Sequence, residues 1–212
     1  MSDNTNNRRV PAVVIKRLPR YYRYLGELLN QGIRRISSNA LSEKMGVTAS
    51  QIRQDFNYFG GFGQQGYGYK VDYVYNAIGD ILGLYESYTT IIIGAGNLGC
   101  ALANHNFEKR GFRLIGMFDI DPKITGTEIN GTKVYHIDEL EDFIRKNKVD
   151  IGILTVPKSE IDVIAERLCD SGIKGLWNFS SAELNLKNET PIENVHLSDS
   201  LMTLSYKIKQ KD

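Results

Sequence analysis

A short glycine-rich segment, Gly94-Ala95-Gly96-Asn97-Leu98-Gly99, has the most specific spacing in the sequence. It follows an apolar, β-branched run at 89–93 and precedes a helical pattern, the setting in which G-x-G-x-x-G binds a dinucleotide. The first glycine permits a tight turn, the second lets a pyrophosphate approach the backbone, and the third lets helix and strand pack closely. Free N–H groups at the helix start favour phosphate oxygens. All six residues are therefore candidate cofactor contacts; a strand–helix turn without a ligand is the alternative.

An acidic residue at the end of the next expected strand indicates which nucleotide would bind. Asp119 ends the segment Gly116-Met117-Phe118-Asp119, 20 residues after Gly99. A carboxylate in this place accepts hydrogen bonds from ribose hydroxyls and repels a 2′-phosphate, so NAD(H) is favoured over NADP(H). The charge of Lys123 would soften that preference.

A second set of polar residues lies on a helix expected to end near Tyr58. Ile52, Phe56 and Phe59 form its apolar stripe. Arginine reads guanine and glutamine reads adenine through paired hydrogen bonds, and one such contact discriminates by about 1–3 kcal/mol. The candidate base contacts, which project away from the stripe, are Ser50, Gln51, Arg53, Gln54 and Asn57. The candidate phosphate contacts, which position without specifying, are Lys16, Arg17, Arg20 and Lys70. An ordinary polar helix face is the alternative.

The elements that would position these residues form a helix-turn-helix. Apolar residues recur at helical spacing from Leu18, and Gly32 ends that helix. Ser38 is the expected cap of a helix over 40–45, with Gly46 after its end. Thr48-Ala49-Ser50-Gln51 has the pattern of a capping box, which opens the helix expected to read the bases.

A glycine-rich stretch after this helix predicts a β-hairpin. Five of the twelve residues at 60–71 are glycine, interleaved with aromatic residues. Such a hairpin next to a helix-turn-helix is the wing of a winged helix. The wing residues expected to contact DNA are Gly66, Tyr67, Gly68, Tyr69 and Lys70. An apolar helical pattern at 71–82 then leads to Gly83.

The remainder of the chain alternates strands and helices. Strands are expected at 89–93, 114–118, 151–156 and 176–179, with a helix at 159–171. This alternation predicts an α/β fold with a parallel, doubly wound Rossmann sheet that carries helices on both faces. The expected domains are 1–82 for DNA binding, 83–196 for NAD(H) binding, and a C-terminal helix within 197–212.

Composition limits the class of protein. Hydrophobic residues make up 42% and charged residues 24% of the 212 residues, as in globular proteins. Residues 1–70 hold 11 Lys+Arg and 4 Asp+Glu, a balance of +7, whereas the rest has a balance of −6. This asymmetry favours a polyanion as the partner of the first third, with a solvated basic face as the alternative. Two cysteines, no metal-ligand spacing, no signal peptide and no membrane-spanning run favour a cytoplasmic protein without a metal.

These motifs, together with further short stretches, are spread along nearly the whole chain. They include Lys16–Arg23, Ser50–Phe56, Tyr58–Gly63, Gly66–Tyr69, Gly94–Gly99, Phe118-Asp119, Thr155-Val156-Pro157 and Gly172–Gly175. In this combination the chain resembles the Rex family of bacterial redox-sensing transcriptional repressors. The resemblance implies a homodimer that binds a palindromic operator when NADH is scarce and releases the DNA when NADH binds.

The resemblance also implies further roles. It places Thr155, Val156, Pro157, Asn178, Phe179 and His105 at the NAD(H) site, and it implies that the C-terminal helix is swapped between subunits. The residues alone show an apolar stripe at Leu201, Leu204 and Ile208. Such a stripe at the end of a chain more often packs onto its own domain, so the swap rests on the resemblance.

Three positions differ from what is usual in the family. His105 and His196 stand where family members have a tyrosine and an aspartate, and Ser181 replaces a proline. In the family, that aspartate pairs with the arginine at Arg17 in one redox state and with the tyrosine in the other. A neutral histidine can accept a hydrogen bond, whereas a protonated one repels arginine. We expect Arg17, His105 and His196 to act as switch residues with altered pairing, and Asp199 is another possible partner.

Two other classes of function fit parts of the sequence. One is an NAD-dependent oxidoreductase with an accessory DNA-binding domain, for which His105 would be the proton donor. The sequence offers no supporting constellation and no substrate domain of adequate length. The other is a regulator that binds CoA or another nucleotide. The basic, glycine-rich wing favours the repressor over the dehydrogenase, and Asp119 favours ribose recognition.

Overall fold

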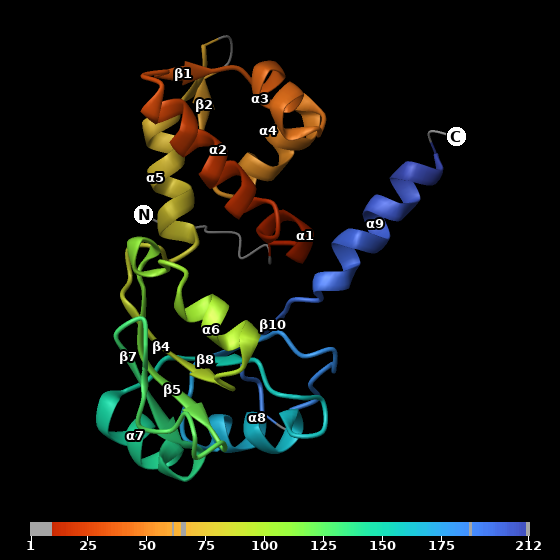
Figure 1. Cartoon of the computed structure of the whole chain (residues 1–212). Helices are drawn as coiled ribbons and strands as arrows, with labels where there is room; N and C mark the ends of the chain where they lie inside the picture. Colours follow the sequence, from red (N-terminus) through yellow and green to blue (C-terminus); the bar gives the residue numbers. More distant parts are fainter. Residues whose placement is uncertain (1–9, 61, 65–66, 187, 211–212) are drawn as a thin grey trace. The chain divides into compact units, whose positions relative to one another are not determined.

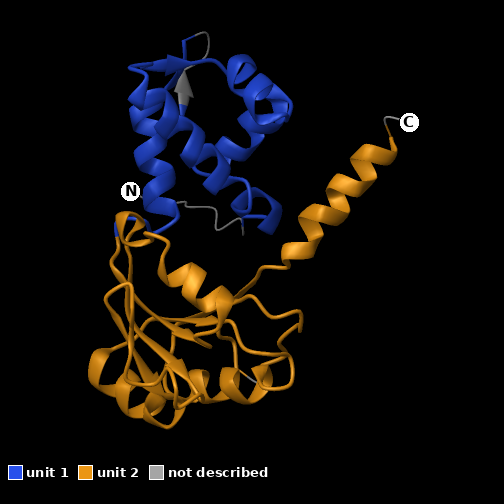
Figure 2. Ribbon diagram, in the orientation of Figure 1, with its two compact units in different colours: residues 1–85 blue, residues 86–212 orange. Residues whose placement is uncertain are grey.

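The computed structural model describes residues 10–60, 62–64, 67–186 and 188–210. The contacts divide the chain into two units, residues 1–85 and residues 86–212, which Figure 2 shows in different colours. The boundary expected after residue 82 stays a prediction.

The first unit is a set of helices with a small three-stranded sheet at one end (Figure 1). Its elements are α1 (Ala12–Ile15), α2 (Leu18–Asn30), β1 (Arg35–Ile36), α3 (Ser38–Met45), α4 (Ala49–Asn57), β2 (Gly63–Gln64), β3 (Gly68–Lys70) and α5 (Val71–Ile81). The sheet order is β1-β3-β2, with both pairings antiparallel. This arrangement confirms the helix-turn-helix and the wing, and it adds β1, which the sequence analysis missed.

The helices of the first unit meet around one apolar core. Leu18, Leu25, Ile52, Val74 and Ile78 are fully buried in it. They come from α2, α4 and α5, so these three helices are fixed to one another by packing. Burying a large apolar side chain contributes about 1.5–3 kcal/mol.

Two details at the helix starts differ from the sequence prediction. The cap of α3 is Ser37, whose Oγ accepts from the Ala40 N–H at 3.1 Å, so the choice of Ser38 was wrong by one residue. Extended backbone at Ser37 places that hydroxyl over the first turn. At α4, Thr48 accepts from the Gln51 N–H as expected. The Gln51 side chain does not complete a capping box, because it donates to Asp55 instead.

The second unit is a seven-stranded sheet between two layers of helices. Its elements are β4 (Tyr88–Ile93), α6 (Asn97–Ala103), β5 (Phe112–Asp119), β6 (Glu128–Ile129), β7 (Thr132–His136), α7 (Leu140–Asn147), β8 (Ile151–Leu154), α8 (Ile161–Asp170), β9 (Gly175–Asn178), β10 (Ile192–Asn194) and α9 (Leu197–Lys209), with short 3-10 turns at Glu108–Arg110 and Ile137–Glu139. The strand order is β10-β9-β8-β4-β5-β7-β6, parallel except for the antiparallel edge strand β6. The doubly wound fold is therefore confirmed.

Alternate residues of the central strand pack on opposite faces of this sheet. Ile91 and Ile93 face the core that α7 and α8 cover, and Ile92 faces the α6 side. Figure 1 shows α6 on one side of the sheet and α7 and α8 on the other. Since β4 lies between β5 and β8, its carboxyl end is the point where the strand order reverses, the usual place for a ligand in such sheets.

Candidate functional site

The glycine segment forms the loop between β4 and α6, and its glycines differ in their surroundings. A Cβ on Gly94 would lie 2.9 Å from the Thr155 carbonyl oxygen, and one on Gly99 would lie 2.0 Å from the Gly94 oxygen. A Cβ on Gly96 would meet nothing within 4 Å. Gly94 also has a φ of 99°, which favours glycine. The first and third glycines thus allow close packing, while the second faces open space.

Three side chains hold this loop in place. The Thr155 hydroxyl donates to the Gly94 oxygen at 2.7 Å and also lies 3.0 Å from the Ile93 oxygen. Asp119 Oδ2 accepts from the Ala95 N–H at 2.7 Å, and Cys100 Sγ lies 3.1 Å from the Ala95 oxygen. The loop is therefore bound to the ends of β5 and β8 as well as to its own helix.

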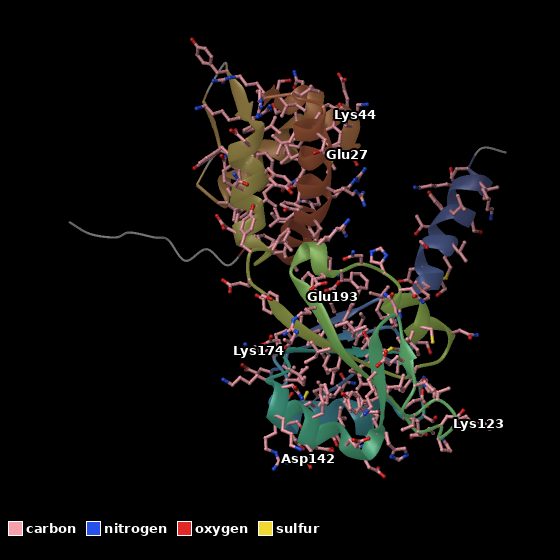
Figure 3. The ribbon with its side chains drawn as sticks, turned by 60° about the vertical axis from the view of Figure 1, so that its left-hand side comes forward. Glu27, Lys44, Lys123, Asp142, Lys174 and Glu193 are labelled. Carbon is pink, nitrogen blue, oxygen red and sulfur yellow. The ribbon has the colours of Figure 1, made fainter. Side chains whose placement is uncertain are left out.

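Asp119 is already engaged by the protein. Its Oδ1 accepts from the Asp121 N–H at 2.9 Å, in addition to the Ala95 contact on Oδ2. A carboxylate oxygen accepts two hydrogen bonds, so each oxygen keeps one acceptor site for a ribose hydroxyl. Lys123 is exposed on the loop after β5, where Figure 3 labels it.

The remaining predicted cofactor contacts have varied surroundings. Val156 packs half-buried against the α7–α8 side of the core, and Pro157 is exposed. Asn178 is fully buried, and its amide donates to the Ala182 oxygen and to Asn194 Oδ1, both at 2.8 Å. Its own Oδ1 accepts from the Ser180 N–H. Asn178 thus holds the chain after β9 in place.

An aromatic row runs along the α6 side of the sheet. The His105 ring lies 4.4 Å from that of Phe107, Phe107 lies 5.5 Å from Trp177, and Trp177 lies 4.6 Å from Phe179, measured between centroids. His105 and Phe179 were predicted from the sequence, whereas Phe107 and Trp177 between them were not. Their positions, 70 residues apart, give no periodic signal in the sequence.

In the first unit, α4 presents most of the predicted base contacts to solvent. Ser50, Arg53, Gln54 and Asn57 are exposed, whereas Gln51 is half-buried. The Arg53 guanidinium donates to the Ser38 hydroxyl at 2.9 Å, so Ser38 orients Arg53 rather than capping α3. The exposed face is polar and accessible, as contact with base edges requires.

Asp55, which no part of the sequence analysis singled out, is the centre of a buried network. It is 0% exposed. Arg17 donates to both its oxygens, at 2.6 and 2.7 Å, Tyr21 donates through its hydroxyl at 2.8 Å, and Gln51 through its amide at 2.9 Å. Burial raises the pKa of Asp55, but these hydrogen bonds and the charge of Arg17 outweigh it, so the pKa lies below its ordinary value. Arg17, expected to contact phosphate, is here an internal partner of α4.

The small sheet of the first unit carries positively charged side chains on β1 and β3. β1 and β3 pair Arg35 with Lys70, and Arg35 donates to the Tyr67 oxygen at 3.2 Å. Lys70 and Tyr67 are exposed, as are Lys16 and Arg20, while Tyr69 is buried. At Gly68, with a φ of 68°, a Cβ would lie 2.6 Å from the Ile36 oxygen, so glycine lets β3 approach β1 closely. Gly66 lies outside the described residues.

The C-terminal helix shows an unusual surface. Every described residue of α9 is exposed, including the apolar side chains Leu197, Leu201, Met202, Leu204, Tyr206 and Ile208. His196 precedes the helix and is half-buried. An apolar surface of this kind marks an interaction site.

Within the described ranges, no group of three or more His, Cys, Asp or Glu side chains is placed to hold a metal ion. None of the helices described is both long and apolar enough to cross a membrane.

Comparison with known proteins agrees with this two-part arrangement. The family model described as "Putative DNA-binding protein N-terminus" matches residues 9–57, and "CoA binding domain" matches residues 85–182. The "Redox-sensing transcriptional repressor Rex" of Caldicellulosiruptor saccharolyticus (strain ATCC 43494 / DSM 8903 / Tp8T 6331) is 56% identical over 95% of this chain and 93% of its own length. The chain belongs to the Rex family. The Rex protein of Clostridium perfringens (strain SM101 / Type A) is 50% identical, over 96% of both chains.

Solved Rex structures match both units. A Rex-family repressor, RSP, has a TM-score of 0.90 at 54% identity and 95% coverage of both chains. RSP in complex with β-NAD⁺ and operator DNA has a TM-score of 0.89 at 57% identity, covering 95% of this chain and 94% of that one. RSP in complex with β-NADH has a TM-score of 0.89 at 53% identity and 96% coverage of both. Because the relatives are named as repressors, the Rex family assignment replaces the oxidoreductase alternative.

Proposed function

We propose that this Rex-family chain is a transcriptional repressor that binds operator DNA and responds to the NADH/NAD⁺ ratio, with NADH releasing the DNA. The observation that carries the proposal is the match of both units, at more than 50% identity, to a repressor solved with NAD⁺ plus operator DNA and with NADH. Since operators lie on the chromosome, the proposed place of action is the cytoplasm.

The proposed NAD(H) site is the loop between β4 and α6 with the ends of the neighbouring strands. Gly96 leaves room for the pyrophosphate, and Asp119 keeps acceptor capacity for the adenosine ribose. Its negative charge disfavours a 2′-phosphate, which supports NAD(H) over NADP(H). The proposed nicotinamide side includes Thr155, Val156, Pro157, Phe179 and His105, while the buried Asn178 would support it by holding the chain after β9.

The proposed DNA surface is the exposed face of α4 with the wing. Arg53, Gln54, Ser50 and Asn57 would contact bases, and Lys16, Arg20 and Lys70 would contact phosphates. The excess of basic residues in the first 70 positions supports attraction to a polyanion.

A homodimer is the proposed working unit. The apolar surface of α9 is exposed in the single chain, so a second copy that received this helix would remove it from water. Two copies related by a two-fold axis would match a palindromic operator. NADH would then release DNA by binding more tightly to the conformer that cannot hold the operator. A hundredfold loss of DNA affinity corresponds to a coupling free energy of about 2.7 kcal/mol.

The test is a pair of titrations on the purified full chain. Duplexes selected by the protein from a random library supply the operator, and fluorescence anisotropy then measures its affinity without nucleotide and with NADH, NAD⁺ or NADPH. We expect NADH to weaken binding strongly, and NAD⁺ and NADPH to have little effect. Equal affinity under all four conditions would contradict redox sensing, and failure to select any duplex would contradict operator binding.

A further inference from the structure

Every acceptor site of the buried Asp55 carboxylate is filled by a donor. Oδ1 accepts from Arg17 and Gln51, and Oδ2 accepts from Arg17 and Tyr21. Two hydrogen bonds per oxygen are the full capacity of a carboxylate. Because Asp55 is 0% exposed, no contact with water could replace one that is lost. The network is therefore complete only when α4 lies in the position seen here.

The donors come from three separate parts of the first unit. Arg17 stands at the corner between α1 and α2, Tyr21 lies one turn later on α2, and Gln51 lies one turn before Asp55 on α4. The bidentate Arg17 contact fixes direction as well as distance, since the guanidinium fork and the carboxylate are planar. Next to it, the Tyr21 ring packs edge-on against Phe56 at 5.2 Å. The network thus fixes the rotation of α4 about its own axis.

The rotation of α4 decides which side chains reach a DNA duplex. Arg53 and Gln54 lie next to one another on the exposed face, while the Gln51 amide is turned inward to Asp55. If α4 were rotated about its own axis by one residue position, a different set of these side chains would face the DNA. Contacts to base edges tolerate little displacement, because each hydrogen-bonded pair needs correct distance and angle.

We propose that Asp55 is a positioning residue for DNA recognition, which holds α4 through Arg17 and Tyr21 and makes Gln51 part of this support rather than a base contact. The inference rests on the proposed operator binding. It assigns discrimination between sequences to a residue that does not touch the DNA.

The test compares affinities for the selected operator and for a scrambled duplex of the same length. Asp55→Asn keeps the size of the side chain and removes its charge, and Tyr21→Phe removes one hydrogen bond. We expect Asp55→Asn to lower the operator-to-scrambled ratio about tenfold, because misplaced base contacts lose their discrimination, and to leave scrambled affinity unchanged or higher. For Tyr21→Phe we expect a smaller fall, about threefold. Gln51→Ala should lower the ratio less than Arg53→Ala.

Controls separate positioning from charge and from folding. Glu27→Gln removes one negative charge from the exposed surface of α2 (Figure 3) and should leave the ratio unchanged. Circular dichroism and thermal unfolding identify a temperature at which each variant is folded, and Tyr21→Phe decides the matter should Asp55→Asn not fold. Folded variants with the wild-type ratio would overturn the inference, because a purely structural role changes stability alone. Wild-type protein without any discrimination would instead contradict the proposed function.

Discussion

The open space beside Gly96 allows a substitution that should change the affinity for a dinucleotide without lowering the stability of the fold. In Gly96→Ala, the new methyl group has no protein atom within 4 Å. The backbone at this residue has φ −70° and ψ −168°, an extended conformation that alanine adopts freely. A glycine-to-alanine change at such a position raises the free energy of unfolding by about 0.4–1 kcal/mol, because it restricts the unfolded chain. We therefore expect no loss of stability.

Dinucleotide binding should respond in the opposite direction. The methyl group would occupy the side from which the pyrophosphate is expected to approach the loop. An NADH affinity at least tenfold weaker, equivalent to about 1.4 kcal/mol, is the expected result. Titration followed by NADH fluorescence measures the affinity, and denaturant unfolding measures the stability.

Gly99→Ala is the matched comparison in the same loop. Its methyl carbon would lie 2.0 Å from the Gly94 oxygen, so the loop or the helix must move. Overpacking of this kind costs about 1–3 kcal/mol, and both stability and NADH binding should fall. Wild-type NADH affinity in a stable Gly96→Ala protein would refute the assignment of the pyrophosphate to this loop.

Three further predictions concern the other parts of the chain. Arg53→Ala should weaken operator binding by about 1–3 kcal/mol more than binding to a scrambled duplex, measured by anisotropy, and equal losses on both would argue against base contact. The lowered pKa of Asp55 contributes stability that is complete above its unfolded pKa of about 4 and is lost as the pH falls through the lower folded pKa. Urea unfolding between pH 3 and 7 should show this loss of stability in wild type and less of it in Asp55→Asn. Parallel curves of stability against pH for the two proteins would contradict the assignment. Leu201→Asp should convert dimers to monomers in sedimentation velocity, whereas Thr203→Asp, on the polar face of α9, should not; dimers in both would place the interface elsewhere.

Local patterns allowed most of the fold to be predicted from the sequence. The glycine segment follows a β-branched strand within a few residues, so its turn needs no distant partner to be recognised. The same holds for α2 and for the capped start of α4. By contrast, β1 has two residues and forms only because β3 returns beside it. β7 has only one buried residue, Val134, among polar and aromatic neighbours, so it was not separated from the surrounding loops.

The candidate site was predicted less completely than the fold. Asp55 was not predicted to be buried, because aspartate is rarely buried unless it has a partner. Its main partner, Arg17, lies 38 positions earlier in the sequence, so the pairing could not be recognised locally. Its position between Ile52 and Phe56 is on the inner side of α4, but helical spacing alone does not say which charge will meet it. For the same reason, the Gln51 side chain was predicted to project toward the DNA. Pairing across such distances is fixed by tertiary packing, which composition and periodicity do not report.

The three attachments of the β4–α6 loop bear on how free energy from a nucleotide is distributed. Thr155, Asp119 and Cys100 hold the loop through contacts within the protein. Contacts of this kind restrain the loop independently of a nucleotide, so less of the binding free energy is consumed in ordering it. The remainder is available to shift the balance between conformers of the whole protein.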